Sequence, residues 1–461
     1  MSPRIPVTPI DTSEIDTYDR ETDVLVIGYG CAGAAAALEA DAAGAQVIAT
    51  RAPERWWRIV DFVGRRGVPR RRHPDPGGVR VHRHRRGHGE VPARCTRPGR
   101  RSGEGGPVQP RERRALPVAR GPWGAVQAVA VGISYLPTWV PPTDDGLMWM
   151  GENAYPFYEI ATPAPRGHRV TSEGFGGKVL MAVLCEAVEE SAVAVHTDTS
   201  VLRLIRNGDR VVGVVARHFG ETVTYRARRG VVLTTGGFAD NVEMLAQHAP
   251  QLVGLAVTSD GGDDGRGIVM AQAAGAAVKH MSAGQVGISL VPGMMVRGMI
   301  VDSLGRRFIN EDVYPGLVGQ ATLFEHNLHV WVILAEEAYE EVPVDERWGV
   351  QPHFVAETLE ELEREIGMPE GALQTTVGEY NRFAEHGEDP YFHKSARWLR
   401  PLQAPFAAID VRRGVSPPEY GDNVGAGGAE VFTIGGLRTT VDGAVLDLGD
   451  EPIPGLFAAG V

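Results

Sequence analysis

Residues 23–50 read DVLVIGYGCAGAAAALEADAAGAQVIAT, and this stretch decides the fold. A short apolar run leads into a glycine turn, which is followed by an alanine-rich segment, residues 34–43, and by a second apolar run, residues 45–49. A strand-like run, a glycine turn and a helix-like segment in this order indicate strand, turn, helix and strand. The stretch therefore predicts an α/β fold.

Gly28, Gly30 and Gly33 form G-x-G-x-x-G between that strand and that helix, which is the context that gives the motif its meaning. The first glycine permits a tight turn, the second lets the backbone approach a pyrophosphate, and the third lets the helix pack closely on the strand. The helix N-terminus adds free N–H groups and a partial positive charge. The motif predicts a dinucleotide site, with a purely structural glycine turn as the alternative. An acid on the second strand normally binds the ribose, but residues 49–51 read ATR.

Length and composition fit a globular protein with room for two packed domains, since the chain has 461 residues, 43% of them hydrophobic and 23% charged. No window holds the roughly 18 apolar residues that a membrane helix needs, and residues 1–18 lack the basic start and apolar core of a signal peptide. We therefore expect a cytoplasmic protein without a membrane span. The cysteines, Cys31, Cys95 and Cys185, have no metal-type spacing, so neither a disulfide framework nor a metal site is predicted.

Charge is distributed unevenly along the chain, although the formal net charge is -12. All but three of the 46 basic residues are arginine, which suggests a GC-rich gene. Residues 51–120 hold about twenty arginines against six acids, and residues 51–131 show neither a helical nor a strand period. Three interpretations are open: a nucleic-acid-binding arm, a solvated disordered loop, or a frameshifted stretch of the gene.

The frameshift can be tested by writing GC-rich codons and reading them displaced by one nucleotide. Residues 50–57 then encode Leu-Glu-Arg-Pro-Ser-Gly-Gly. This reading returns the missing acid and begins a Gly/Ser-rich loop that is suited to phosphate and flavin. We therefore favour a frameshift over about residues 50–131, and we predict that this stretch is disordered and binds no nucleic acid.

The chain again has the pattern of a folded enzyme from residue 133 onward. Helical periods occur in residues 178–192, 267–277, 358–366 and 371–384. Strand patterns occur in residues 200–206, 211–217 and 230–234.

Six segments carry a resemblance to a known family: ETDVLVIGYGCAGAAAALEA at 21–40, ENAYPFYEIATPAPRGH at 152–168, RRGVVLTTGGFADN at 228–241, GRRFINEDVYPG at 305–316, GGLRTTVDG at 435–443 and PIPGLFAAG at 452–460. On these segments the chain resembles the FAD-binding family of fumarate reductase flavoproteins and 3-ketosteroid dehydrogenases, and within it most closely the 3-ketosteroid Δ4-(5α)-dehydrogenases. The resemblance implies FAD as the cofactor. It also implies a Rossmann-type FAD-binding domain, residues 20–284 and 419–461, interrupted by an α+β cap, residues 285–418, that shapes the substrate pocket.

The resemblance also implies which residues form the site. Those assigned to FAD are the glycine turn with Cys31 and Ala32, Val201 at the adenine, the second turn at Thr235, Gly236 and Gly237, and also Asp264, Gly265 and Gly460. A tight strand exit is the alternative for the second turn. Tyr314, in NEDVYPG, matches an active-site tyrosine of the steroid subgroup. A phenol, with a pKa of about 10, can donate to or accept from a carbonyl or enolate, and packing within the cap is the alternative role.

The implied reaction removes two hydrogens from adjacent carbons beside a ketone, as hydride to the flavin and proton to a base. The partners would be a steroid-like ketone and an electron acceptor that the sequence does not identify. A fumarate reductase would need cations for two carboxylates, for which Arg297 and Arg306 are available. An NAD(P)-dependent dehydrogenase, a nucleic-acid-binding protein and a non-catalytic remnant are further alternatives. The family continues past GLFAAG with a Gly-rich segment carrying catalytic hydroxyls, so we expect a truncated, inactive chain.

Overall fold

The computed structural model describes residues 7–52, 147–148, 153–163, 167–168, 177–259, 261–288, 292–344, 347, 350–413 and 429–460. The structural statements below concern those residues. Most of the stretch for which we predict a frameshift and disorder, residues 53–131, lies outside them.

The opening strand–turn–helix–strand unit forms as the sequence indicates. Strand β2 is Arg20–Ile27, helix α1 is Cys31–Ala42, and strand β3 is Val47–Thr50. β3 pairs in parallel with β2. Helix α1 buries Gly33, Ala34 and Ala37, and these small side chains let the helix lie close to the sheet.

These strands belong to a nine-stranded sheet with the order β1-β7-β8-β9-β2-β3-β6, in which β20 also pairs with β9 and with β19. The other strands of this sheet are β1 (Ile10–Asp11), β6 (Ala194–His196), β7 (Thr199–Asn207), β8 (Arg210–His218), β9 (Glu221–Leu233), β19 (Ala444–Leu446) and β20 (Pro452–Ala458). Strands β2, β3, β6, β9 and β20 run parallel. Their carboxyl ends therefore meet at one edge of the sheet, where ligands of open α/β sheets bind.

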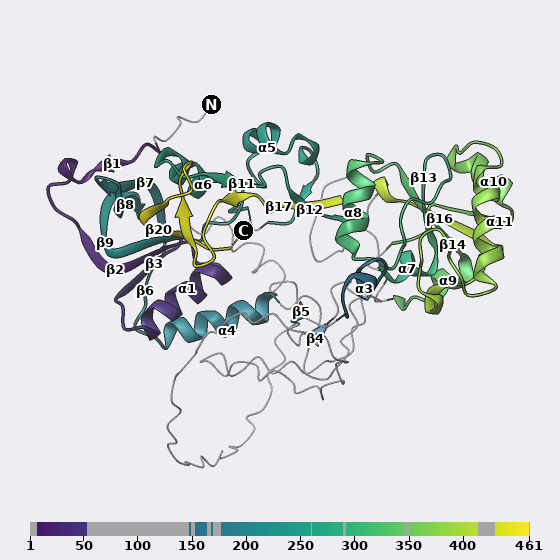
Figure 1. The fold of residues 1–461 in the computed structure, drawn as a ribbon, viewed down its shortest axis with the longest axis horizontal. Helices are drawn as coiled ribbons and strands as arrows, with labels where there is room; N and C mark the ends of the chain where they lie inside the picture. Colours follow the sequence, from purple (N-terminus) through teal and green to yellow (C-terminus); the bar gives the residue numbers. More distant parts are fainter. Residues whose placement is uncertain are drawn as a thin grey trace, which may run out of the picture.

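Both faces of the parallel strands are covered, as expected for buried parallel strands. Leu25 and Ile27 point to one face, where Met270 of helix α6 (Arg266–Ala273) joins the same apolar cluster. Val26 points to the opposite face and packs with Ala37 of α1. Helix α4, Gly177–Glu189, lies against α1, and Figure 1 shows these two helices together, on the other side of the sheet from α6.

A small sheet lies between two lobes of the molecule (Figure 1). Its order is β10-β17-β12, with β10 at Ala256–Val257, β17 at Ala429–Thr433 and β12 at Gly284–Ile288. Val286 and Val431 face a cluster that includes Leu323 of helix α8, Pro315–Phe324. The short strands β11 (Val278–Lys279) and β18 (Gly436–Leu437) pair beside it, and helix α5 (Val242–His248) and the 3-10 turn η2 (Pro250–Leu252) pack nearby. We call this β10-β17-β12 sheet the junction sheet.

The second lobe comprises residues 292–413. Its antiparallel sheet has the order β13-β14-β16-β15, with strands Met299–Asp302, Val330–Ala335, Phe406–Asp410 and Phe354–Ala356 in that order. Ile300 and Val332 face a cluster shared with helices α7 (Pro292–Arg297) and α9 (Glu336–Glu340). Met299 and Ile333 face another, shared with α10 (Leu359–Ile366) and α11 (Ala372–Ala384). Alternation along the strands thus gives the sheet two apolar faces, each covered by helices.

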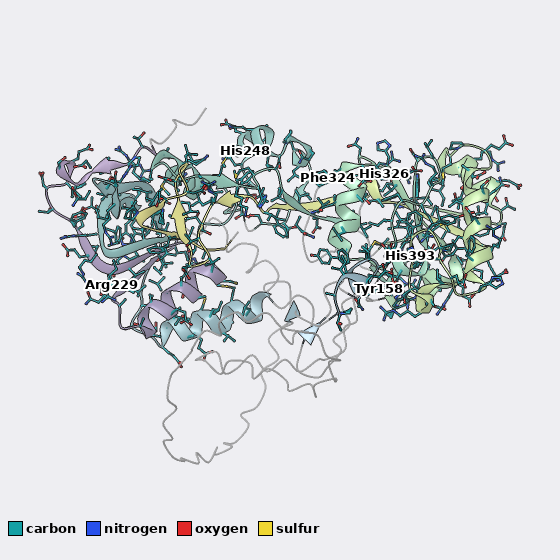
Figure 2. The ribbon with its side chains drawn as sticks, in the orientation of Figure 1. Tyr158, Arg229, His248, Phe324, His326 and His393 are labelled. Carbon is teal, nitrogen blue, oxygen red and sulfur yellow. The ribbon has the colours of Figure 1, made fainter. Side chains whose placement is uncertain are left out.

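A segment that precedes α4 in the chain lies against this second lobe. Helix α3, Phe157–Ile160, follows Tyr155, whose ring lies 4.0 Å from that of His393, centroid to centroid. Figure 2 shows Tyr158 beside His393. The remaining short elements are η1 (Thr12–Glu14), β4 (Leu147–Met148), β5 (Gly167–His168), η4 (Ala396–Trp398) and η5 (Val411–Arg413).

Two elements differ from the sequence pattern by more than three residues at one end. Helix α6 ends at Ala273 rather than at residue 277, because Gly275 has a positive φ of 98° and turns the chain. Strand β9 begins at Glu221, nine residues before the expected start, because its first half pairs with β8 and alternates exposed residues with the buried Tyr225 and Ala227. None of the described helices has the length and apolar character to cross a membrane. The cytoplasmic location stays a prediction.

Candidate functional site

The glycine turn lies at the carboxyl end of β2. Gly28 has φ +106°, and a Cβ added there would overlap the carbonyl oxygen of Thr234. A Cβ added at Gly33 would overlap the carbonyl oxygen of Gly28. At Gly30, in contrast, an added Cβ would meet no atom of the described residues within 4 Å. Two of the glycines are therefore required by packing, whereas the third leaves an open side from which a ligand can approach.

Helix α1 begins at this open side, with Gly30 as its N-cap and no side chain bonded to the cap. The N–H groups of its first turn, at Cys31, Ala32 and Gly33, have no partner within the helix. Together with the helix dipole they can hold an anion such as a pyrophosphate. The Cys31 thiol is exposed and lies 3.2 Å from the sulfur of Met181 in α4. The structure therefore places its side chain against α4, where it packs on a neighbouring helix.

The second turn lies beside the first. Thr234 donates its hydroxyl to the carbonyl of Ile27 at 2.9 Å, which ties the ends of β9 and β2 together. Gly236 has φ +74°. The N–H of Gly237 donates to Asp263 at 3.0 Å, and its carbonyl accepts from the N–H of Gly265 at 3.0 Å.

Helix α6 closes this region from the other side. A Cβ at Gly267 would overlap the hydroxyl of Thr235, so the first turn of α6 lies directly on the second glycine turn. Asp264 accepts from the N–H of Arg266 at 2.9 Å, and this bond organises the start of α6. The residues expected at 235–237 and at 264–265 are therefore neighbours in space.

The end of strand β20 also reaches the glycine turn. The N–H of Ala459 donates to the carbonyl of Leu233 at 3.0 Å. A Cβ at Gly460, which has φ +89°, would lie 3.0 Å from the Cβ of Ala32. Gly460 thus lies against the first turn of α1, and its contact with FAD stays a prediction.

The position after β3 is where an acid is expected. Arg51 stands there, with its N–H donating to the carbonyl of His196 at 2.9 Å and its carbonyl accepting from the N–H of Thr199 at 2.7 Å. Val201 lies two residues after Thr199, and its side chain is buried in the core cluster of the large sheet. The described residues 50–52 supply no carboxylate for a ribose.

Tyr314 lies at the other end of the candidate site, as the N-cap of α8, with Pro315 in the first turn. Its phenol oxygen accepts a hydrogen bond from the side-chain amide of Gln285 in β12 at 3.3 Å. Burial raises the pKa of the Tyr314 phenol, and the Gln285 hydrogen bond works in the opposite direction. The nucleotide-side residues thus lie close to one another, whereas Tyr314 lies beside the junction sheet, in contact with Gln285.

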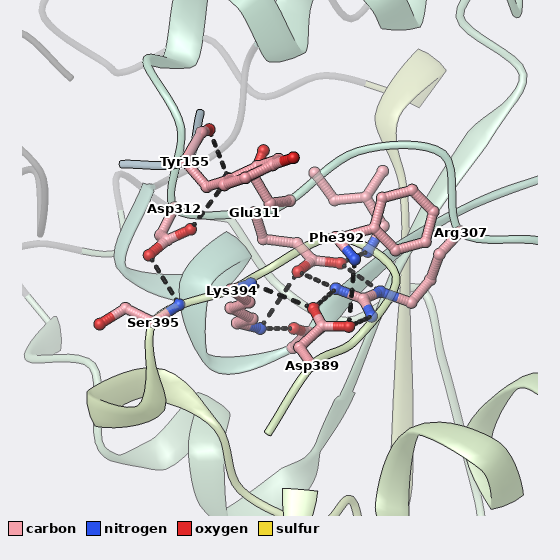
Figure 3. A network of polar contacts seen from close by, with 11 residues as sticks. Tyr155, Arg307, Glu311, Asp312, Asp389, Phe392, Lys394 and Ser395 are labelled. Atoms are coloured by element: carbon pink, nitrogen blue, oxygen red, sulfur yellow. Dashed lines mark hydrogen bonds and ion pairs between the residues drawn. The ribbon is translucent and has the colours of Figure 1, made fainter. Parts of the chain in front are cut away.

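A buried group of charges holds the loop that carries Tyr314 (Figure 3). The Glu311 side chain is 0% exposed and pairs with Arg307 at 2.8 Å and with Lys394 at 3.3 Å. Arg307 also pairs with Asp389 at 2.9 Å. Burial alone would raise the pKa of Glu311, but Arg307 and Lys394 hold it below its usual value. We call these four residues the buried charge cluster.

Asp312, the next residue, fixes the loop from the opposite side. It accepts from the N–H of Ser395 at 3.1 Å and from the amide of Asn310 at 3.4 Å. Burial raises the pKa of Asp312. The loop is thus bound through two consecutive carboxyl groups, and Tyr314 follows two residues later.

Several residues of this region were not found from the sequence. Gln285, Phe432 and Glu430 lie on one face of the junction sheet, because β12 and β17 pair Gln285 with Phe432 and Gly287 with Glu430. Burial raises the pKa of Glu430. Gln285 and Phe432 are about 150 residues apart in the chain, so no local pattern could have shown that they pair. Gly316 is the last residue of the NEDVYPG segment, so the family resemblance of that segment was the signal that could have identified it.

A separate pocket lies between α11 and the segment 388–392, with a volume of about 320 Å³. Its lining includes Arg307 and Asp389, which pair with each other, and Tyr391, which donates to Glu379 at 2.9 Å. Neither Tyr314 nor the glycine turn lines it. We therefore do not assign it to the site. Among the described residues no group of three or more His, Cys, Asp or Glu side chains could hold a metal ion.

Comparison with known proteins identifies the family. Residues 58–461 match the sequence model of the FAD binding domain family. This chain belongs to that FAD-binding family. FAD is the cofactor expected from the sequence, and the family match confirms this expectation. The same match disfavours the NAD(P)-dependent alternative.

Among solved structures, this FAD-binding family member is similar to the 3-ketosteroid-Δ4-(5α)-dehydrogenase of Rhodococcus jostii RHA1, crystallised in complex with 4-androstene-3,17-dione. The TM-score is 0.74 and the identity 35%, over 98% of this chain and 93% of that chain. The chain is 28% identical to a probable fumarate reductase of Shewanella frigidimarina, over 64% of this chain and 50% of that protein. It is also 28% identical to a 3-oxosteroid 1-dehydrogenase of Mycolicibacterium smegmatis, over 62% and 56%. The chain thus spans about half the length of these curated relatives.

Proposed function

We propose that this flavoprotein dehydrogenates a 3-ketosteroid-like substrate at adjacent carbons beside the ketone. The observation that carries the proposal is the similarity, along nearly the whole of both chains, to a 3-ketosteroid-Δ4-(5α)-dehydrogenase. Tyr314, a half-buried phenol hydrogen-bonded by an amide, supports it from the chemistry of this chain. The partners are then a steroid-like ketone and an electron acceptor whose identity is open.

The residues that bind FAD would lie on the large sheet, and the phenol that contacts the substrate would come from the second lobe. Gly28, Gly30 and Gly33, with the first turn of α1, would hold the pyrophosphate of FAD, and the open side of Gly30 fits that group. Residues 235–237, residues 264–265 and Gly460 would line the same cofactor, and Val201 would lie at the adenine. When bound, FAD accepts the hydride. Tyr314 would hydrogen-bond the ketone oxygen and polarise the carbon–hydrogen bonds beside it.

The division into domains is part of this proposal. A Rossmann-type FAD-binding domain, residues 20–284 and 419–461, would be interrupted by an α+β cap, residues 285–418. The separate apolar clusters of the second lobe support this division. The junction sheet supports the division too. In this sheet β12, where the cap would begin, pairs with β17, which would come after the end of the cap in the chain.

Reduction of fumarate is the alternative within the family, and the placement of the two candidate arginines argues against it. Arg297 lies 3.3 Å from Glu341 and donates to the carbonyl of Gly293 at 2.8 Å. Arg306 pairs with Asp302 at 2.8 Å and lines the separate pocket beside α11. Both cations are engaged within the second lobe, so neither is offered to a dicarboxylate.

We also propose that a reading-frame shift begins at about residue 50. The one-nucleotide shift encodes Glu in place of Arg51, which is the first residue after β3 and the position where a ribose-binding acid belongs. A frame-restored chain would then bind FAD tightly, whereas the chain as it stands would bind FAD weakly and show no turnover. A non-catalytic remnant remains the alternative for the chain as it stands. Resequencing the gene across the codons for residues 49–132 tests the frameshift directly.

The test of the activity uses the frame-restored chain, extended by the Gly-rich segment that the family resemblance implies, with a 3-ketosteroid and an artificial electron acceptor. We expect steroid-dependent reduction of the acceptor, and we expect Tyr314→Phe to slow turnover by about 10²- to 10⁴-fold, which is the usual contribution of a positioned proton donor. Flavin content should survive that change because the phenol lies away from the glycine turn. Reduction of fumarate without action on steroids would reject the substrate assignment. Full activity of Tyr314→Phe would reject the role of the phenol.

A further inference from the structure

We propose that Gln285 is a positioning residue for Tyr314, which fixes the direction of the phenol. This rests on the proposed function only for the importance of Tyr314, since the pairing itself is a property of the fold. Gln285 belongs to β12 of the junction sheet, and Tyr314 begins α8. The pair therefore joins the second lobe to the sheet that leads back to the flavin side of the molecule (Figure 1).

The hydrogen bond defines what the phenol can do. An amide N–H can only donate, so the Gln285 amide, at 3.3 Å, engages the phenol oxygen as an acceptor. A phenol that accepts in this way keeps its own proton for donation. The bond from Gln285 thus fixes the position of the phenol oxygen without using the proton of Tyr314.

The chain leaves room for this pair by means of a glycine. A Cβ added at Gly316 would overlap both the Gln285 amide nitrogen and the ring edge of Tyr314. The φ of Gly316 is not in the left-handed region, so the need for glycine here arises from contact and not from backbone conformation. The amide, the ring and the backbone of α8 are therefore packed as one unit.

Gln285 itself is firmly placed. β12 pairs with β17 along its whole length, Gly284 to Ile288, with Phe432 opposite Gln285. On the α8 side, the side-chain amide of Gln320 donates to the carbonyl of Gly284 at 3.2 Å. The strand is held both within the sheet and by the helix that Tyr314 begins. The donor to the phenol consequently has little freedom to move away.

The same contact affects the ionisation of Tyr314. Burial raises the pKa of the phenol, and donation from Gln285 favours the phenolate and so lowers it. Removal of the amide should leave burial unopposed and move the phenol titration to higher pH. A carboxylate at the same place should move it further, because a nearby negative charge disfavours the phenolate.

The experiment is a titration of Tyr314 in the full chain, without substrate. ¹³Cζ-tyrosine NMR follows the phenols, and the resonance lost in Tyr314→Phe identifies the group. Gln285→Leu and Gln285→Glu are compared with Gln320→Leu, a matched control that removes an amide hydrogen bond from the same strand without touching the phenol. Thermal unfolding of all three variants shows whether the fold is kept.

We expect the titration of Tyr314 to move upward in the order Gln285→Leu, then Gln285→Glu, and to stay at its original pH in Gln320→Leu. Equal titration in Gln285→Leu and Gln320→Leu would overturn the proposal. Should Gln285→Leu fail to fold, Gln285→Asn, which keeps an amide but shortens the side chain, provides the same comparison. An upward shift of the Tyr314 titration, together with a frame-restored and extended chain that does not oxidise steroids, would support the pairing while rejecting the proposed function.

Discussion

The glycine turn and the Tyr314 loop are held in place by opposite means. In the turn, Gly28 and Gly33 fit because a Cβ at either position would overlap backbone, and the contacts form among residues at strand ends of one sheet. In the loop, Glu311 and Asp312 are fixed by charges and N–H groups that come from residues 307 and 389–395. Close packing of backbone atoms fixes the glycine turn, whereas charged and polar contacts between residues far apart in the sequence fix the Tyr314 loop. The two should therefore respond differently to substitution and to pH.

The largest effect is expected from Lys394→Met in the buried charge cluster. The Lys394 side chain is 0% exposed, and its removal leaves Arg307 alone to balance Glu311 and Asp389. An uncompensated buried charge costs about 3–5 kcal/mol of unfolding free energy. Denaturant unfolding measures it, with Arg382→Met as the control, since the Arg382–Glu379 pair is exposed and should contribute less than about 1 kcal/mol. Equal losses in both variants would contradict a role for burial.

Glu311 should make the stability of the second lobe depend on acid pH. Its pKa in the folded state lies below the ordinary value of 4.5. Its stabilising contribution is therefore fully present above about pH 4.5 and is lost as the pH falls through the folded-state pKa. Urea unfolding between about pH 6 and pH 3 should show a shallower loss for Glu311→Gln, which starts from a lower stability. If the unfolding free energy of Glu311→Gln fell with decreasing pH as steeply as that of the wild type, the acid sensitivity would come from groups other than Glu311.

Smaller effects should separate two glycines of the turn. Gly28→Ala forces a Cβ onto Thr234 at a φ of +106° and should cost about 1–3 kcal/mol of stability. Gly30→Ala has open space and a φ of -86°, so its stability should change by less than about 0.5 kcal/mol. In the frame-restored chain, however, the new methyl group would occupy the side from which a pyrophosphate approaches, and FAD affinity should fall. Unchanged FAD affinity in a folded Gly30→Ala protein would reject the assignment of the FAD pyrophosphate to this turn.

The same contrast explains what could be predicted from the sequence. The strand, turn and helix at residues 23–42 were predictable because a glycine turn between two periodic segments is a local signal. Helices α10 and α11 were also predictable, and Thr358, which caps α10 with its hydroxyl, marks the start of the first. The first half of β9 was missed because exposed polar and charged residues alternate there with the buried Tyr225 and Ala227, which weakens the apolar pattern.

Residues that act through distant partners could not be predicted. Lys394 is one of three lysines in the chain, yet nothing in its surroundings shows that it reaches Glu311, 83 residues earlier. Gln285 marked only a domain limit in the sequence, whereas the fold gives it a contact with Tyr314. Tyr314 itself was identified by resemblance, and its role stays a prediction.

Flavin retention tests the central claim most directly. The frame-restored chain and the chain as it stands are purified in parallel with added FAD, desalted, and compared by visible flavin absorbance per mole of protein. Because a glutamate would replace Arg51 at the end of β3 only in the first, we predict near-stoichiometric FAD on the frame-restored chain and little or none on the chain as it stands. Stoichiometric FAD on the chain as it stands would contradict the frameshift and the need for an acid at that position.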